Sequence, residues 1–573
     1  MPRATRAARA WTFAAYLALA TLVHFAVGAY QSGFGGFEDE PAHLVTALMI
    51  RDWIVAGFHD PYAWLDPRGF AETYYIHYPK VAIGQWPPVL HAMLAVWMLV
   101  FGASKVAIVS LLTIVTAVLA SLVCELVRRP LGLWAGTVAG MMFLTVPIVQ
   151  LCSGAAMTEL PVALFSFLAV LFFGRFLETG RARWVWSFAG AAAATVLTKG
   201  TGLALALVPA LAIAFSGRWE VLKRPSLWAA GALVGLLTAP WYLVTVSMTQ
   251  DSWGGGSSPS WAYAKFAATS YAGWSWDLAG VLGLCLVPVG TWWGLRECRR
   301  RRPESDRWAA LAAWALALAA LHHVVPSSVE ERHLSVLAPV WIVFAALGAG
   351  HAALGLARRW QRQGLAQGEP TGEGAVAGLG VAVLAVSALL WNGAPPVKDF
   401  RGWDIAGAEW VERLPEGPTR MLIASDPVGE GLFVAGAALA DEVRRGGADP
   451  RALVIRASKA LCHAGWSGRS YVPLFSEQRA LEDWLESKGV GLIAIDESVR
   501  ETRHWYPHMD QLLTAIHADG SPWVEVERWD VVRNAAHEPA ALVGYLRQGW
   551  RDLPLPDLRL EEIRAVALDA ADH

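Results

Sequence analysis

The stretch SKVAIVSLLTIVTAVLASLVCELV, residues 104–127, decides the fold class of this chain. It holds only two charged side chains, Lys105 and Glu125, and one lies near each end. A helix that crosses a membrane needs about 20 consecutive, mostly apolar residues. Stretches of this kind recur along the first 391 residues and predict a polytopic α-helical membrane protein with about eleven spans. The candidate spans are 11–30, 104–127, 131–151, 161–177, 184–198, 201–216, 226–247, 277–295, 308–326, 334–356 and 374–391.

The composition excludes several other classes of protein. Of 573 residues, 55% are hydrophobic and only 17% are charged, so too few charged side chains remain to cover a soluble protein of this size. The formal net charge is −2, so basic residues do not outnumber acidic ones, and we expect no nucleic acid as a partner. The five cysteines are widely separated in the sequence, which argues against a disulfide scaffold and against a cysteine-built zinc site.

The distribution of basic residues predicts how the spans are oriented. Arginine clusters fall between the spans, and positively charged loops stay in the cytoplasm, as does the arginine-rich N-terminus. The apolar run 89–102 is too short to cross a bilayer, so we place it as an interfacial helix in a long outer loop, 31–103. Residues 1–30 are interpreted as a signal anchor, with a cleaved signal peptide as the alternative. Either choice leaves the loop that follows outside the cytoplasm.

The character of the sequence changes after Trp391, where apolar runs shorten and charge rises. Short strand-like runs alternate with helix-like runs here, which is typical of an α/β domain. We therefore divide the chain into a membrane domain, 1–391, and a soluble domain, 392–573, that lies outside. The candidate strands are 421–425, 452–456, 490–495 and 523–526, with helices that begin near Gly431, Ser476 and His508. The segment SDPVGEG (425–431) is a weak match to a dinucleotide-binding turn, and we favour a structural turn.

An acidic segment follows the first span directly. It contains Glu38, Asp39 and Glu40, then Pro41 and His43. One interpretation is a helix start, with an acidic cap and proline at the first helical position. A cap needs only one acid, however, and neighbouring negative charges increase the proton affinity of a carboxylate, which suits a general base.

Further polar groups fall on the predicted outer side, close to apolar runs. Each has a structural alternative: a turn at Lys80 and Trp86, a helix cap at Glu159, and snorkelling of Lys199 to the interface. Arg332 lies in the short acidic and basic segment between two late spans. A lysine inside a membrane region is costly, so a partner or an anionic ligand is expected. Phosphate is the ligand that lysine and arginine together favour.

Six short motifs occur in order along the predicted membrane part: FEDEPAH (37–43), PKVAIGQWPPVLH (79–91), MTELP (157–161), LTKG (197–200), APWYL (239–243) and ERHLSVLAP (331–339). With these motifs, the first 390 residues or so resemble the GT-C membrane glycosyltransferases, especially the bacterial relatives of protein O-mannosyltransferases and lipid A aminoarabinose transferases. The resemblance implies that Asp39 and Glu40 are the catalytic acidic pair and that Glu159 is the acid of the second outer loop. Relatives often carry a basic residue directly before the Pro-Pro pair, where this chain has Trp86.

The resemblance implies an inverting transfer of a sugar from a polyprenyl-phosphate donor to an envelope hydroxyl, at the periplasmic face of a bacterial inner membrane. The acceptor is a lipid, a glycan or a protein. Lys80, Lys199 and Arg332 are the candidate phosphate ligands. No cofactor is assigned; a divalent ion held by Glu40, His43, His77 or His91 is left open, because their spacing is not diagnostic. Two alternatives from other classes remain: a transporter of lipid-linked or anionic substrates, and a non-catalytic binding protein.

Overall fold

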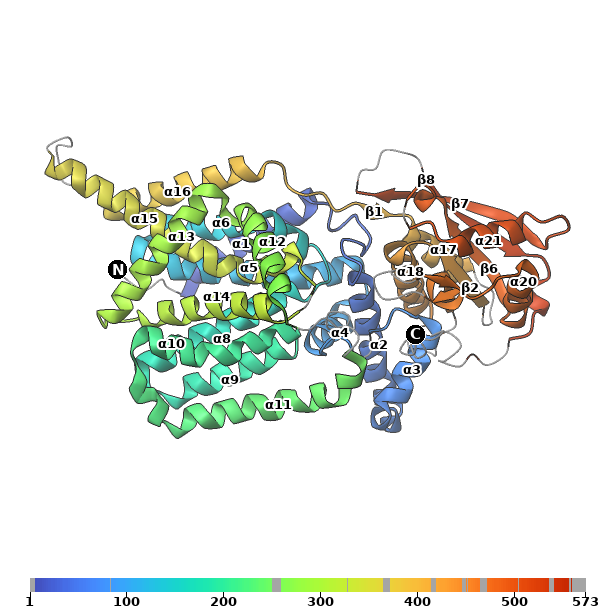
Figure 1. Cartoon of the computed structure of the whole chain (residues 1–573), viewed down its shortest axis with the longest axis horizontal. Helices are drawn as coiled ribbons and strands as arrows, with labels where there is room; N and C mark the ends of the chain where they lie inside the picture. Colours follow the sequence, from blue (N-terminus) through green and yellow to red (C-terminus); the bar gives the residue numbers. More distant parts are fainter. Residues whose placement is uncertain are drawn as a thin grey trace. The chain divides into compact units, whose positions relative to one another are not determined.

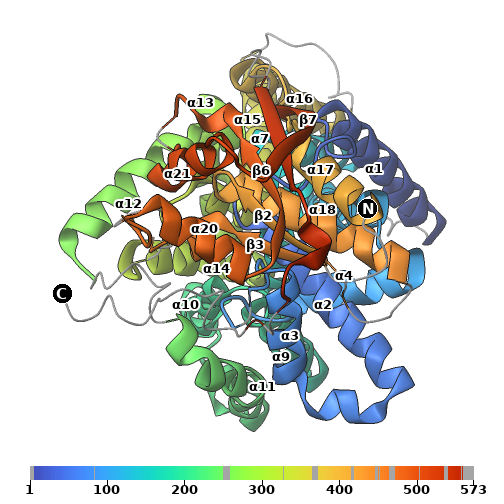
Figure 2. The ribbon, with the colours of Figure 1, turned by 90° about the vertical axis from the view of Figure 1, so that its right-hand side faces the viewer.

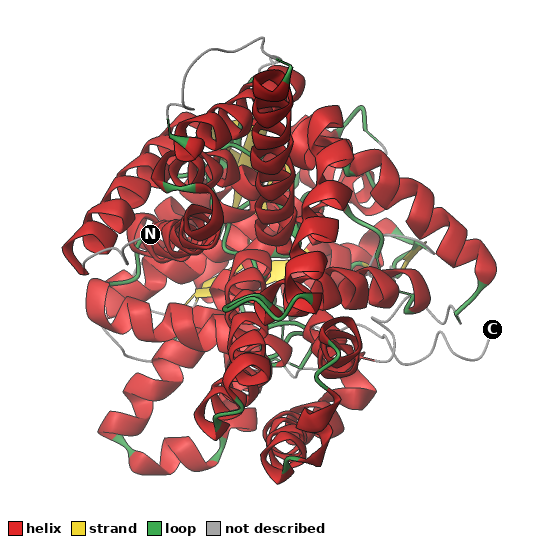
Figure 3. Ribbon diagram, turned by 90° about the vertical axis from the view of Figure 1, so that its left-hand side faces the viewer, coloured by secondary structure: helices red, strands yellow, loops and turns green. Residues whose placement is uncertain are grey.

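The computed structural model is mostly helical (Figure 3), and its residues group into two compact units. It describes residues 6–82, 84–249, 259–326, 328–363, 372–413, 419–445, 450, 452–463, 471–502, 504–534, 540–555 and 558. Unit 1 comprises Met1–Val27, Gly84–Leu90 and Val109–Val397, and unit 2 comprises Gly28–Ile83, His91–Ile108 and Lys398–His573. Much of the predicted outer loop thus shares a unit with the C-terminal region. The expected division at residue 391 stays a prediction.

Unit 1 consists of helices, most of them apolar (Figure 1). Its α-helices are α1 (Arg6–Ala26), α5 (Lys105–Leu131, whose first residues belong to unit 2), α6 (Leu133–Leu144), α7 (Pro147–Ser153), α8 (Glu159–Thr179), α9 (Ala182–Val196), α10 (Val208–Ser216), α11 (Pro225–Thr249), α12 (Trp261–Trp274), α13 (Trp276–Arg299), α14 (Asp306–Val324), α15 (Ala338–Arg362) and α16 (Glu373–Asn392). Its 3-10 helices are η2 (Gly200–Leu207), η3 (Trp219–Lys223) and η5 (Glu331–Val336).

The helix lengths support the prediction of a membrane protein with several spans. They do not determine how many spans there are. Within the described residues, five helices are long and apolar enough to cross a membrane, or up to seven if each of two bent pairs counts as one span. The pair α6–α7 bends by 65°, where Pro147 begins the second helix, because proline does not continue the preceding one. Every predicted span range contains helix. The total of eleven spans stays a prediction.

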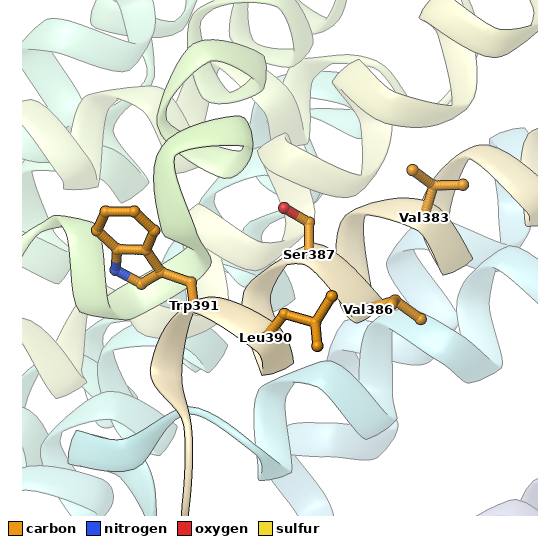
Figure 4. Close-up of a pocket in the computed structure, with 5 residues that line it drawn as sticks. All are labelled: Val383, Val386, Ser387, Leu390 and Trp391. Carbon is orange, nitrogen blue, oxygen red and sulfur yellow. The ribbon is translucent and has the colours of Figure 1, made fainter.

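Unit 1 exposes apolar side chains on its surface and buries hydrogen-bonded polar ones, as two examples show. Helix α16 turns Val383, Val386, Leu390 and Trp391 outward, and with Ser387 they line an open hollow (Figure 4), as expected for a lipid-facing surface. In contrast, the buried His24 ring lies 2.8 Å from Thr113 Oγ1 and 2.7 Å from Ser153 Oγ, so both ring nitrogens have partners. This contact ties α1, α5 and α7 together.

The helices of the outer loop lie in unit 2. They are α2 (Glu40–His59), η1 (Pro61–Leu65), α3 (Pro67–His77) and α4 (Val89–Phe101, whose first two residues belong to unit 1). Helix α4 has 13 residues, as short as expected from the sequence; its interfacial location stays a prediction. Val96, Val100 and Phe101 on it are exposed, whereas Leu94 is buried.

The C-terminal part of unit 2 is a six-stranded mixed sheet in the order β1-β7-β8-β6-β2-β3. Strands β3, β2 and β6 are parallel, and β6, β8, β7 and β1 pair antiparallel. The strands are β1 (Phe400–Arg401), β2 (Thr419–Ala424), β3 (Ala452–Arg456), β6 (Val490–Asp496), β7 (Trp523–Arg533) and β8 (Ala540–Arg547), with a separate pair β4 (Cys462–His463) and β5 (Val472–Pro473). All four predicted strands are present.

Helices cover both faces of this sheet. One face packs on α20 (Gln478–Ser487) and α21 (Pro507–Ile516), which Figure 2 shows, through Leu485, Leu512 and Ile493. The other face packs on α17 (Trp403–Arg413) and α18 (Pro427–Arg445), where the ring of Trp410 contacts Phe433 and Trp529. The short elements are α19 (Ala457–Ala460), η6 (Glu497–Val499) and η7 (Trp550–Asp552). The expected α/β domain is therefore present; its location outside stays a prediction.

Candidate functional site

The acidic segment after α1 is held by a buried ion pair. The carboxylate of Glu40 is fully buried, and its Oε1 lies 2.7 Å from Lys398 Nζ, the first residue of the C-terminal part of unit 2. Its other oxygen accepts a 2.8 Å hydrogen bond from the backbone N–H of Gly36. Burial lowers the pKa of Lys398, and the Glu40 charge acts against that shift. Glu40 is thus paired on both oxygens, which leaves it poorly placed to exchange a proton with a substrate.

Asp39 differs from Glu40 in burial and in partners. It occupies the N-cap position of α2, with Pro41 in the first turn, so the expected helix start is confirmed. Its side chain forms no cap hydrogen bond with α2, however, and it is only partly buried, beside the exposed Glu38. Capping therefore does not explain this carboxylate.

Lys80 lies close to the same acidic segment. Its ammonium group donates to the carbonyl oxygen of Pro427 at 3.3 Å, and the side chain is almost fully buried. Burial lowers the pKa of Lys80 to about 7; Arg456 lowers it further, while the carboxylates of Asp39, Glu430 and Glu38 act in the opposite direction. Lys80 is therefore close to half-charged at neutral pH, and the charge of Asp39 acts on it.

The loop that carries Lys80 packs at the carboxyl ends of the parallel strands. Ligands of open α/β sheets commonly bind at this edge. Here Arg456, at the end of β3, donates to the carbonyl oxygen of Pro79 at 3.4 Å, and Tyr78 hydrogen-bonds to Asp441. A Cβ on Gly431 would lie 3.0 Å from Lys80 Cε, so glycine allows the close approach of α18. The SDPVGEG segment thus leaves β2, begins α18 at Pro427 and packs against the protein's own loop, so only Ser425 and Asp426 form the turn favoured from the sequence.

A second cluster, in unit 1, brings three of the predicted residues together. Glu159 begins α8 and is fully buried; Lys199 Nζ lies 2.7 Å from its Oε1, and Arg332 Nε lies 3.7 Å from the same oxygen. Arg332 also pairs with Glu330 at 2.6 Å. Glu159 is therefore the partner of Lys199, whose identity the sequence did not give. All three charged groups lie at helix ends or in short 3-10 segments.

The remaining candidate residues make the following contacts. His43 Nδ1 lies 2.9 Å from His91 Nε2, and both rings are buried in unit 2. Trp86 is partly buried in the Gly84–Leu90 segment of unit 1. His77 contacts the carbonyl oxygen of Ala452 at 2.9 Å. Within the described part of the chain, no three histidine, cysteine or acidic side chains are grouped as metal ligands, so the metal interpretation gains no support.

Sequence reasoning missed residues that complete both clusters. Lys398 pairs with Glu40, which lies 358 positions earlier in the chain. In the sequence, the one feature that sets Lys398 apart is its place shortly after the last predicted span. Beside the unit 1 cluster, Tyr271 OH lies 2.9 Å from His333 Nδ1, and the His333 ring stacks on His322 with centroids 4.9 Å apart. His333 is part of the quoted ERHLSVLAP motif, which was a signal that it belongs near Arg332.

We expect Lys398→Met to destabilise the packing of the acidic segment, because it leaves a fully buried carboxylate unpaired. The local unfolding free energy, measured by amide hydrogen exchange of peptides spanning 28–45 in the full-length protein, should fall by about 3–5 kcal/mol. Lys223→Met, at an exposed lysine, is the matched control and should change nothing. The double variant Glu40→Gln, Lys398→Met should recover most of the loss. A fall below about 1 kcal/mol in Lys398→Met would show that the pair is not desolvated.

The chain also matches known proteins. Residues 85–243 match the family model described as dolichyl-phosphate-mannose-protein mannosyltransferase. No protein with a curated description matches the sequence. Among solved structures, ArnT from Cupriavidus metallidurans in the apo state matches with 14% identity and a TM-score of 0.53, over 94% of this chain and 98% of that one.

Two further solved structures match at similar levels. ArnT bound to undecaprenyl phosphate matches with 14% identity and a TM-score of 0.50, over 93% of this chain and 97% of that one. The apo oligosaccharyltransferase of Archaeoglobus fulgidus matches with 13% identity and a TM-score of 0.52, over 96% of this chain and 77% of that one. The resemblance that the motifs indicate is confirmed: the chain has the fold of the GT-C membrane glycosyltransferases.

Proposed function

We propose that this protein is a glycosyltransferase that moves a sugar from a polyprenyl-phosphate donor to a hydroxyl of an envelope acceptor, with inversion. The single observation that carries the proposal is Asp39: a partly buried carboxylate at a helix start whose side chain does not cap that helix. The fold supports the same activity, since GT-C proteins of this fold include ArnT, which has been crystallised with undecaprenyl phosphate. The matched family model describes a dolichyl-phosphate-mannose-dependent enzyme.

Asp39 acts as the general base in this proposal. It takes the proton of the acceptor hydroxyl while that oxygen forms a bond to the anomeric carbon of the donor sugar. The bond between that carbon and the phosphate oxygen breaks, and polyprenyl phosphate leaves with its electron pair. A phosphate leaving group needs cations to stabilise its charge, and it does not need a general acid. Glu40, held by Lys398, positions the segment that carries Asp39.

Lys199 and Arg332 bind the donor phosphate in this proposal. Both cations point at one oxygen of Glu159, which keeps them together in a buried setting. Charge-assisted hydrogen bonds to a phosphate are strong in such a site. A transporter of lipid-linked substrates would place its charged groups at broken helices near mid-membrane. The charges here sit at helix ends, which favours the enzyme.

We place the site on the periplasmic face of a bacterial inner membrane, with the C-terminal sheet domain on the same side. Support comes from the arginine clusters between the predicted spans, which orient those loops to the cytoplasm. The shared unit of the outer loop and the C-terminal sheet also supports it, since segments that pack together lie on one side of a membrane.

Asp39→Asn tests the base directly. Asparagine keeps the size of the side chain and caps helices about as well as aspartate, but it cannot take the hydroxyl proton. We expect sugar transfer to fall by roughly 100-fold or more, with expression and donor binding retained. Glu40→Gln is the control: if it is inactive and Asp39→Asn is active, the roles of the pair are exchanged. Full transfer by both variants would contradict a glycosyltransferase site in this segment.

Lys199→Ala and Arg332→Ala test the donor site. Each loses one charge-assisted contact to the phosphate, so donor binding should weaken by about 1.5–3 kcal/mol, measured by titration with a polyprenyl-phosphate sugar. Arg358→Ala is the matched control, because Arg358 forms an exposed pair with Glu373 at another place in unit 1. Normal donor binding by both variants would mean that the phosphate binds elsewhere.

Lys80→Arg tests whether the charge of Lys80 takes part in catalysis. The pKa of Lys80 lies at about 7, so its positive charge is lost as pH rises through that value. If transfer needs the charge, the rate of the wild type should fall above pH 7. Arginine stays protonated throughout, so Lys80→Arg should move this decline upward by more than about one pH unit. If the transfer rate of Lys80→Arg falls at the same pH as that of the wild type, Lys80 is not the group whose titration causes the fall.

A further inference from the structure

Three aromatic rings in unit 2 form a stepped shelf, which we define as Tyr471, Tyr506 and His508. Their ring planes are close to parallel, at 9°, 25° and 15° to one another. Their centroids are 5.3, 5.8 and 5.7 Å apart, so each ring is about equally far from the other two. Three rings in a stacked column would place the outer two much farther apart. The rings therefore form a triangle of offset, near-parallel pairs and not a column, and both tyrosines are partly exposed.

The hydrogen bonds of the shelf favour one tautomer of His508. Tyr471 OH accepts a hydrogen bond from the backbone N–H of His508 at 3.1 Å, and it also lies 3.0 Å from His508 Nδ1. Because the hydroxyl oxygen already accepts one bond, we assign its proton to the bond with Nδ1, and this assignment places the ring proton on Nε2. Burial lowers the pKa of His508 to about 4, so the ring is neutral at physiological pH. Nε2–H is then a buried donor, and it has no partner among the described residues.

A matching acceptor lies one turn along the same helix. Gln511 follows His508 by three positions on α21, so the two side chains share one helix face. Its amide nitrogen donates to the carbonyl oxygen of Phe475 at 2.8 Å, whereas its Oε1 is buried without a partner in the described part of the chain. An unpaired buried donor and an unpaired buried acceptor on one face are unusual in a native structure. A hydroxyl group, which donates and accepts at once, satisfies both.

The shelf lies at the edge of the sheet where ligands of α/β domains bind. Tyr506 and α21 follow the carboxyl end of β6, which is parallel to β2 and β3. Burial raises the pKa of Tyr506, and the carboxylates of Glu430, Asp426 and Glu38 raise it further. Glu38 adjoins the proposed base Asp39 in the sequence. The charge of Glu38, the sequence neighbour of Asp39, therefore acts on Tyr506.

We propose that the shelf of Tyr471, Tyr506 and His508 binds a neutral saccharide of the acceptor, an inference that rests on the proposed glycosyltransferase function. The apolar C–H face of a pyranose packs on the rings, as apolar groups do on tyrosine. One hydroxyl group of the sugar accepts a hydrogen bond from His508 Nε2–H and donates one to Gln511 Oε1. The nearby carboxylates favour a neutral sugar over a phosphorylated or acidic one, because like charges repel. Among lipid, glycan and protein acceptors, a shelf that binds a neutral saccharide favours a glycan.

Saturation-transfer NMR on the full-length protein in nanodiscs tests the shelf. The probe is the neutral oligosaccharide fraction released from the envelope of cells that lack the gene; a peptide fraction of the same envelopes is the comparison. We expect saturation of sugar C–H protons with the wild type, a loss of at least fivefold in Tyr506→Ala and Tyr506→Leu, and retention in Tyr506→Phe. Tyr62→Ala, at an exposed tyrosine on η1, is the matched control and should bind normally.

The outcomes separate this proposal from the proposed function. Asp39→Asn should bind the oligosaccharides as the wild type does, because the shelf needs no catalysis. Binding of the peptide fraction alone, of neither fraction, or of sugar unaffected by Tyr506→Leu would each overturn the shelf, even where transfer is intact. A wild type that binds the sugars through Tyr506 but transfers nothing would overturn the proposed function and leave the shelf in place.

Discussion

The buried ion pair between Glu40 and Lys398 is the constraint on which the arrangement of unit 2 depends. Two charges removed from water are costly unless their geometry is good and every remaining hydrogen-bonding atom is satisfied. The Lys398 ammonium at 2.7 Å and the Gly36 amide at 2.8 Å meet that condition for the two carboxylate oxygens. The pair joins the segment after α1 to the start of the C-terminal sheet region. Asp39 directly precedes Glu40 in the sequence. Its position therefore depends on Lys398, which lies 358 positions after Glu40.

The two charged clusters, one in each unit, hold their charges in different ways. In unit 2, the carboxylates of Glu38 and Asp39 are not fully buried, and Lys80, at a pKa of about 7, carries only part of a charge against them. That setting suits removal of a proton. In unit 1, Lys199 and Arg332 share one buried carboxylate, so a second anion meets two preassembled cations. That setting suits a departing phosphate.

Sequence patterns predicted those parts of the structure that depend on neighbours in the chain. Strands β2, β3, β6 and β7 were found because each is a short apolar run between turn signals. A partner or an anionic ligand was expected for Lys199, although not identified, because an unpaired charge is costly in a membrane. Helix α17 (WDIAGAEWVER) and strand β8 (AALVGYLR) were missed although both are largely apolar, since a glycine interrupts the pattern of each. Lys398 and the shelf could not be predicted, because each joins residues that only the fold brings together.

The packing at the sheet edge limits where a ligand can bind. In an open α/β sheet the crevice beyond the parallel strands is normally available, but here Pro79 and Lys80 contact Arg456 and Pro427 at that edge. A nucleotide would compete with the protein's own loop for these contacts. What remains at the edge is the part beyond β6, where Tyr506 begins the approach to α21. Pro79 and Lys80 thus close the usual ligand crevice, which leaves the aromatic side of the same edge for the proposed acceptor.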